Sequence, residues 1–120
     1  MRELRTIQKR EKLNRVYALD EPGCGGANHE YRIDMNNNIA TVQAIMVFQT
    51  GPRNGPDSTT GVCDQDLLEI VRDRLRGFSQ GELATRETAI ALTHVEEALL
   101  WLNKRTEDRI ERGVLGTMQE

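Results

Sequence analysis

The sequence has few of the large apolar side chains from which a chain of its length usually builds a core. Aromatic residues make up 4% of its 120 residues, and apolar residues of all kinds make up 38%, which is below the usual range for a globular domain. A domain of this size needs one filled core. Because self-association buries apolar surface that a single chain cannot hide, we expect an oligomer.

Long apolar runs, closely spaced cysteines and an excess of positive charge are also missing. No segment approaches the ~18 apolar residues that span a bilayer, and residues 1–15 lack the apolar segment of a secretory signal. Cys24 and Cys63 lie far apart in the sequence, which favours separate thiols in a reducing cytoplasm. The net charge of −3 argues against non-specific DNA binding. We expect a cytoplasmic protein with no membrane or DNA partner.

The first half of the chain contains two extended segments. Residues 1–16 are highly charged and predict a frayed or short helical arm, and the Gly-rich residues 20–30 predict an irregular segment. Residues 31–34 and 39–49 favour strands, and the three consecutive asparagines between them favour a turn. These residues therefore predict a β-hairpin, followed by a Gly- and Pro-containing loop at residues 50–62.

The second half predicts two helices joined by a short connection. Asp64 is the expected N-cap of the first helix, whose end is bracketed by Gly77 and Gly81. Thr85 is the expected N-cap of a longer second helix, which Gly113 stops. The apolar seam of this helix comprises Ala89, Leu92, Val95, Leu99, Leu102, Thr106 and Ile110. Because the seam extends beyond the first helix, its distal half is expected to pack on another chain.

Together these elements predict an α+β fold. A small N-terminal antiparallel β-sheet precedes a C-terminal two-helix hairpin, which is expected to oligomerise through its long helix. One domain is expected over residues 1–120. It consists of an N-terminal arm and Gly-rich loop at 1–29, a β-hairpin and loop at 30–62, and a helical hairpin at 63–117.

Catalytic patterns are absent from the sequence. His29 and His94 stand in unrelated segments, and adjacent acidic residues on a helix point about 100° apart, so they form no carboxylate dyad. The sequence contains no phosphate-binding loop, no nucleophile motif and no metal-ligand spacing. We therefore predict a protein that is not an enzyme and has no catalytic residues, cofactor or metal site.

Arginines near the end of the second helix suggest an anion site. Arg105, Arg109 and Arg112 share one stripe beside the apolar seam, and their planar guanidinium groups suit bidentate phosphate contacts. A solvated face, on which these arginines pair with neighbouring carboxylates, is the alternative. Phe78 at a helix end offers a face on which a base can stack, although core filling explains it equally well. Arg53 adds a cation in the 50–62 loop, where an ordinary surface turn is the simpler interpretation.

Several segments in order resemble the phage "sponge" proteins, namely the Thoeris anti-defence sponge and its anti-CBASS relative. These segments are FQTGP at 48–52, DRLRGF at 73–78, RETAIAL at 86–92 and RTEDRIERGVLGT at 105–117. The N-terminal strands and the long loop are closer to the Thoeris branch. The resemblance implies a protein that acts in the cytoplasm of the infected bacterial host. Such proteins bind cyclic immune signals intact and assemble as dimers or hexamers.

The resemblance also implies particular ligands and residues. The expected ligand is glycocyclic ADP-ribose (gcADPR), and some family members also take cyclic di- or trinucleotides at a second site. By position, Phe78 stacks on the purine, Arg105 and Arg109 hold the phosphates, and Arg53 and Thr88 line the pocket. Thr88 stands where the family usually has Asn. The implied second site comprises Arg112, Gly113, Gly116 and Thr117.

A different class of function remains open beside this one. A small phage regulatory protein would use the same helical hairpin to bind a host or phage protein. It would present an apolar groove and would have no affinity for nucleotides.

Overall fold

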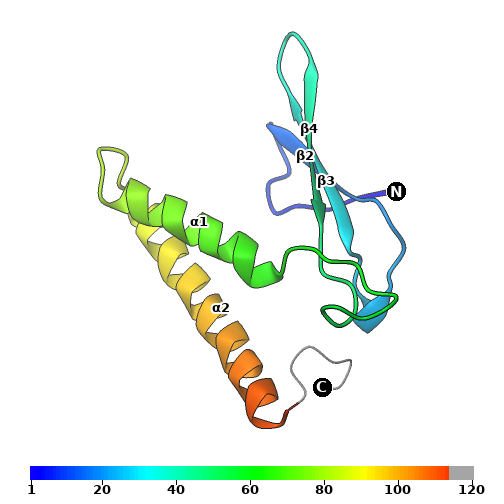
Figure 1. The fold of residues 1–120 in the computed structure, drawn as a ribbon. Helices are drawn as coiled ribbons and strands as arrows, with labels where there is room; N and C mark the ends of the chain where they lie inside the picture. The colour runs from blue at the N-terminus through cyan, green and yellow to red at the C-terminus, as the bar shows by residue number, and fades with distance from the viewer. Residues whose placement is uncertain (114–120) are drawn as a thin grey trace. The chain divides into compact units, whose positions relative to one another are not determined.

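The computed structural model describes residues 1–113, which form two compact units divided after Val62. The first unit is a β-sheet with its loops, and the second is a helical hairpin (Figure 1). The predicted order, an antiparallel sheet followed by two helices, is therefore confirmed. Neither described helix is long and apolar enough to cross a membrane.

The sheet is antiparallel, with its four strands in sequence order. The strands are β1 (Arg2–Glu3), β2 (Asn14–Ala18), β3 (Glu30–Asn36) and β4 (Thr41–Val47). The β3–β4 pair is the hairpin that the sequence predicts, and its Asn-rich turn is closed by Asn37, whose side chain accepts backbone N–H bonds from residues 39 and 40.

The prediction of a frayed or helical arm at residues 1–16 is wrong. Residues 2–3 form β1 and residues 14–18 form β2, which pairs with β3 in the register Val16↔Ile33 and Ala18↔Tyr31. The charged side chains remain exposed on these strands, where Arg15 of β2 and Glu3 of β1 form an ion pair of 2.9 Å. Pairing with a distant strand thus outweighs the local composition of this segment.

One face of the sheet is apolar. The register aligns on this face Val16, Ala18, Tyr31, Ile33, Met35, Val42, Ala44 and Met46. The opposite face carries polar groups such as Arg32, which forms a 2.8 Å ion pair with Asp34 and lies over the ring of Tyr17. Among the described residues Ala18 is the only buried apolar residue. The apolar face is therefore only partly covered.

Asp20 organises the Gly-rich loop between β2 and β3, which contains a short 3₁₀ turn, η1 (Cys24–Gly26). Its carboxylate accepts backbone N–H bonds from His29 at 3.0 Å and Glu30 at 3.2 Å, and a side-chain bond from Asn28. Partial desolvation acts to raise the pKa of Asp20, but these donors outweigh it and hold the pKa below its ordinary value of 3.8. The loop is thus anchored by an ionised carboxylate.

The 50–62 loop folds back along the end of β4. Gln49 donates to Val62, and Val62 donates to Val47, both at 2.9 Å. At Gly61 the backbone passes so close to Val47 and Phe48 that a Cβ atom would collide with their main chains. Only glycine therefore allows this return of the chain.

The two helices are α1 (Asp64–Ser79) and α2 (Arg86–Glu111). Thr85 caps α2 as predicted, since its hydroxyl accepts the N–H of Thr88 at 3.1 Å. The predicted N-cap of α1 is wrong by one residue, because Cys63 caps the helix and its N–H donates to the carboxylate of Asp66 at 2.8 Å. This arrangement is a capping box, in which a carboxylate three residues after the N-cap accepts the N–H of the N-cap residue. The residue three positions after Asp64 is an apolar leucine, which cannot accept such a bond.

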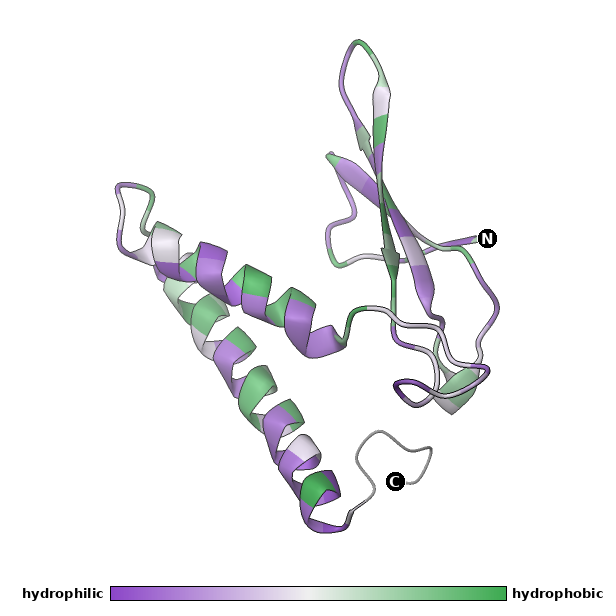
Figure 2. Ribbon diagram, in the orientation of Figure 1, coloured by the Kyte–Doolittle hydropathy of each residue, from purple (hydrophilic) through white to green (hydrophobic). Residues whose placement is uncertain are grey.

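The helical hairpin has arms of unequal length. Helix α1 has 16 residues and α2 has 26, so the distal part of α2 has no counterpart on α1. Apolar and polar residues alternate along both helices (Figure 2). No side chain of the seam is fully buried, and Ile110 at its distal end is 50% exposed. The hairpin therefore lacks a closed core of its own.

Candidate ligand-binding site

Phe78 lies in the last turn of α1 and is not a core residue. Its side chain is 39% exposed, so core filling does not account for it. The guanidinium of Arg74, one turn earlier, stands 5.4 Å from the centre of the ring and forms a cation–π contact. Arg74 was not among the predicted site residues, although its spacing of four residues from Phe78 on a helix predicts this contact.

Thr88 occupies the first turn of α2. Its hydroxyl oxygen lies 2.9 Å from that of Thr85, and its N–H donates to Thr85. The cap therefore fixes the orientation of Thr88. Phe78 and Thr88 both belong to the end of the hairpin where the chain turns from α1 into α2 (Figure 1).

Arg105 and Arg109 belong to the opposite end of α2. Arg105 is exposed, whereas Arg109 is 8% exposed and is the only buried charged residue in the described part of the chain. The sequence did not indicate this burial. At a rise of 1.5 Å per residue, Arg105 stands about 25 Å along α2 from Thr88. One chain therefore does not bring the predicted stacking and phosphate-binding groups together.

The other predicted residues are spread over the chain. Arg53 is exposed in the loop of the sheet unit. Arg112 is the C-cap of α2, and Gly113 follows it with a φ of +70°, the left-handed conformation that favours glycine at a helix end. Gly113 thus terminates the helix region as predicted. Gly116 and Thr117 lie outside the described residues.

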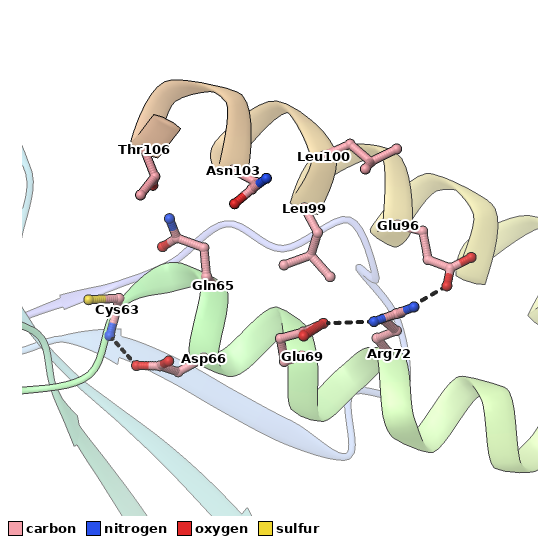
Figure 3. A pocket seen from close by; sticks show the side chains of 10 residues that line it. All are labelled: Cys63, Gln65, Asp66, Glu69, Arg72, Glu96, Leu99, Leu100, Asn103 and Thr106. Carbon is pink, nitrogen blue, oxygen red and sulfur yellow. Dashed lines mark hydrogen bonds and ion pairs between the residues drawn. The ribbon is translucent and has the colours of Figure 1, made fainter. Parts of the chain in front are cut away.

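A cleft opens between the diverging ends of α1 and α2, with a volume of about 750 Å³ (Figure 3). Leu99 and Leu100 contribute apolar surface, and Gln65, Asn103 and Thr106 contribute polar groups. Its charged lining consists of Asp66, Glu69, Glu96 and Arg72.

The cleft lining is acidic because three carboxylates accompany one guanidinium. Arg72 contacts Glu96 on α2 at 2.8 Å and Glu69 at 3.4 Å, and these hydrogen bonds raise its pKa. The carboxylates outnumber the guanidinium, so the lining has a net negative charge. This lining disfavours a phosphate ligand and suits a basic, partly apolar segment instead. The cleft was not predicted from the sequence, because its lining comes from two helices whose divergence is a tertiary feature.

Among the described residues, no group of three or more histidine, cysteine, aspartate or glutamate side chains is arranged to hold a metal ion. The chemical groups that the site offers are therefore an aromatic face, guanidinium groups and hydroxyls. Such groups bind anions and flat rings.

The fold and these groups define a class of small α+β proteins whose C-terminal part is an open helical hairpin. Residues 41–107 match the family model of the Acb2/Tad1 hairpin domain. The chain is also 41% identical over 99 residues to a protein named Thoeris anti-defense 1 from Bacillus phage SBSphiJ7. The aligned part is 82% of this chain and 66% of that relative, just under two thirds of its length.

This chain therefore belongs to the Acb2/Tad1 hairpin family, and the predicted resemblance to the anti-defence sponges is confirmed. The segment that matches the family model includes Arg53, Phe78, Thr88 and Arg105, and it ends before Arg109.

Proposed function

We propose that this chain is a phage anti-defence sponge, which binds a cyclic nucleotide immune signal in the infected host and holds it without degrading it. Membership of the Acb2/Tad1 hairpin family and the relative named for anti-defence against Thoeris support this role. The proposed ligand is gcADPR, bound by Phe78, Thr88, Arg105, Arg109 and Arg53. Cyclic di- or trinucleotides are the proposed ligands of the second site at Arg112, Gly113, Gly116 and Thr117.

The single observation that carries the ligand proposal is the exposed ring of Phe78 beside the guanidinium of Arg74. Stacking of a purine on an apolar ring that is exposed to water lowers the free energy of the complex. The neighbouring cation also favours the negative charge of the adjoining phosphates. Both groups lie at the surface, so a ligand reaches them without unfolding the helix.

A complete site requires a second copy of the chain. The stacking end and the arginine end of one α2 lie about 25 Å apart, whereas two α2 helices packed antiparallel about a two-fold axis place the Phe78 end of one copy beside the Arg105 end of the other. The exposed Leu100 of α2 supports this arrangement, because a second copy packed on α2 would cover an apolar side chain that one chain leaves 69% exposed. Ligand binding and self-association are therefore coupled.

A sponge releases its ligand unchanged. We expect gcADPR incubated with the protein and recovered after heat denaturation to have its original mass and chromatographic retention. Linear ADP-ribose products would instead identify an enzyme.

The direct test is a thermal-shift screen of the full chain with gcADPR isomers and with cyclic di- and trinucleotides. We expect Arg105→Ala to remove the shift that gcADPR produces. Lys104→Ala is the matched control, since Lys104 is the neighbouring exposed cation of the same helix. An unchanged shift with Arg105→Ala would remove this arginine from the site.

The cleft favours a second candidate function, a small phage regulatory protein that seats a helix of a host or phage protein between α1 and α2. Such a protein would show no thermal shift with any cyclic nucleotide. It would instead retain a specific protein from a host lysate, and Leu100→Asp in the cleft would abolish this retention.

A further inference from the structure

The connection between β1 and β2 is longer than a hairpin needs. It spans residues 4–13, called the basic loop below and drawn in blue in Figure 1, whereas hairpin strands are usually joined by about 2–5 residues. Leu4 still pairs with β2, since its N–H donates to Val16 at 2.8 Å. The basic loop also lies outside residues 41–107, which match the hairpin family. Neither closure of the sheet nor the helical hairpin therefore accounts for it.

Positive charge is concentrated at this end of the chain. Residues 1–16 contain six arginine and lysine residues and two glutamates, which gives a net charge of +4. Residues 17–120 contain ten such cations and 17 carboxylate side chains, which gives a net charge of −7. The whole-chain charge of −3, from which we expected no DNA partner, averages over this asymmetry. The basic loop therefore has to be judged by its own charges.

The four cations of the basic loop lack carboxylate partners. They are Arg5, Lys9, Arg10 and Lys12, and the first three are exposed. Within residues 1–113 no ion pair includes any of them. The loop contains one carboxylate, that of Glu11, so its net charge is +3. This positive charge is therefore available to an anionic partner.

The uncharged polar side chains of the basic loop hold its backbone. The hydroxyl of Thr6 donates to the carbonyl of Gln8 at 2.7 Å. The side-chain amide of Gln8 donates to the carbonyls of Arg10 at 3.4 Å and Glu11 at 3.2 Å. These donors are thus engaged within the loop, which leaves the cations and the apolar side chains to meet a partner.

Two aliphatic side chains of the basic loop are open to solvent. Ile7 is fully exposed, and Leu13 is 75% exposed. Residues 1–16 contain no aromatic side chain on which a base could stack. An aliphatic side chain adds little to a nucleic-acid contact, whereas lipid surfaces are bound by cations together with apolar side chains that enter the acyl region. This combination of groups favours a lipid surface.

We propose that the basic loop binds the surface of a membrane that contains anionic lipids. Its cations contact the lipid phosphates, and Ile7 enters the adjoining hydrocarbon. The contact is peripheral, so it requires no membrane-spanning helix, and it overrides the expectation that the protein has no membrane partner. It goes beyond the proposed function and does not rest on it.

The strength of such a contact follows from its two components. Each lysine or arginine near an anionic lipid surface strengthens binding by about five-fold. This component weakens as salt shortens the range of the attraction. The component from Ile7 depends on apolar burial and is insensitive to this screening. Separate variants can therefore distinguish the two.

Co-sedimentation of the full chain with lipid vesicles tests the proposal. One set of vesicles contains equal parts of phosphatidylglycerol and phosphatidylcholine, and the other contains phosphatidylcholine alone. We expect the chain to sediment with the first set far more than with the second, and less as the salt concentration rises. Absence of sedimentation, or equal sedimentation with both sets, would overturn the proposal.

A double variant tests the location of the charge. Lys9→Ala/Arg10→Ala removes two exposed cations and is expected to weaken binding to the anionic vesicles by roughly 25-fold. Arg76→Ala/Arg86→Ala is the matched control, because it removes the same charge from exposed positions on the two helices. The control should bind nearly as well as the original protein. An equal loss in both double variants would show that total charge, rather than the basic loop, determines the binding.

The variant Ile7→Ser separates a lipid surface from a nucleic acid. It keeps every charge, and we expect it to weaken vesicle binding by roughly ten-fold. Fluorescence anisotropy with labelled poly(U) RNA provides the comparison, and we expect the original protein to bind this RNA more weakly than the anionic vesicles. Tighter binding to poly(U), unaffected by Ile7→Ser, would overturn the proposal in favour of a nucleic-acid site. Unchanged vesicle binding by Ile7→Ser would likewise rule out the proposed insertion.

Discussion

At the scale of single residues, the exposed aromatic ring beside a guanidinium is the feature that best explains recognition of a nucleotide. Replacing Phe78 by Ala removes the stacking face. Because stacking of one base contributes about 1–3 kcal/mol, we expect gcADPR binding to weaken by roughly 5- to 150-fold. Isothermal titration calorimetry of the full chain measures this loss.

The variant Phe78→Tyr is the control, since it keeps the ring and should keep most of the affinity. Both variants should leave the free energy of unfolding nearly unchanged, because the side chain is 39% exposed. Equal affinity of the Ala variant and the original protein would show that Phe78 does not contact the ligand.

Asp20 gives the sheet unit a dependence on pH. Because its pKa is lower in the folded chain than its ordinary value of 3.8, the carboxylate stabilises the fold above that pH. Its contribution disappears as the pH falls through the folded-state pKa. We expect Asp20→Asn to be less stable than the original protein at neutral pH, with the difference shrinking as the pH falls below 3.8. Chemical denaturation at neutral and at acidic pH measures this difference, and a difference that grows with acidity would contradict the prediction.

At the scale of elements, the start of α1 depends on a reciprocal cap between Cys63 and Asp66. Loss of a helix cap costs about 0.5–2 kcal/mol, so Asp66→Ala should lower the free energy of unfolding by that amount. Asp64→Ala is the control, because it removes a first-turn carboxylate but not the bond to Cys63. Equal effects of the two variants would show that charge near the helix end, rather than the cap, is responsible.

The helices and the β3–β4 hairpin could be predicted because their signals are local. Thr85 caps α2 by accepting the N–H of the residue three positions later, and Gly113 takes a left-handed conformation at the end of this helix. The turn between β3 and β4 follows from the run of three asparagines. Each of these interactions spans only a few residues, so the spacing of residue types along the chain reveals it.

Strands β1 and β2 and the acidic cleft could not be predicted in this way. Residues 1–16 look disordered by composition, yet β2 is held by β3, which follows more than ten residues later. The cleft likewise depends on how far α1 and α2 diverge, and the burial of Arg109 depends on its surroundings in space. Such features arise from tertiary contacts, which override local preference.

At the scale of the whole molecule, incomplete burial is the dominant feature. Among the described residues, Ala18 is the only buried apolar side chain. Leu100, which lines the cleft, is 69% exposed. We expect Leu100→Asp to lower the solution mass of the assembly, since it places a charge where a second copy is proposed to pack. Light scattering after size-exclusion chromatography measures the mass.

Leu83→Asp is the matched control, because Leu83 is 71% exposed but lies in the connection between the helices. It should leave the mass unchanged. If both variants keep the original mass, the cleft is not an interface between copies.

The central claim is that the stacking group of one copy and the phosphate-binding group of another form a single site. Complementation between two impaired variants tests it most directly. At a gcADPR concentration near the Kd of the original protein, Phe78→Ala and Arg105→Ala are each expected to bind much less gcADPR than the original protein when assembled alone. In a mixed dimer one of the two sites keeps both groups, so co-expression should restore binding at about a quarter of the original sites when copies mix at random. If each chain builds its own site, the mixture will remain impaired, and the shared site will be ruled out.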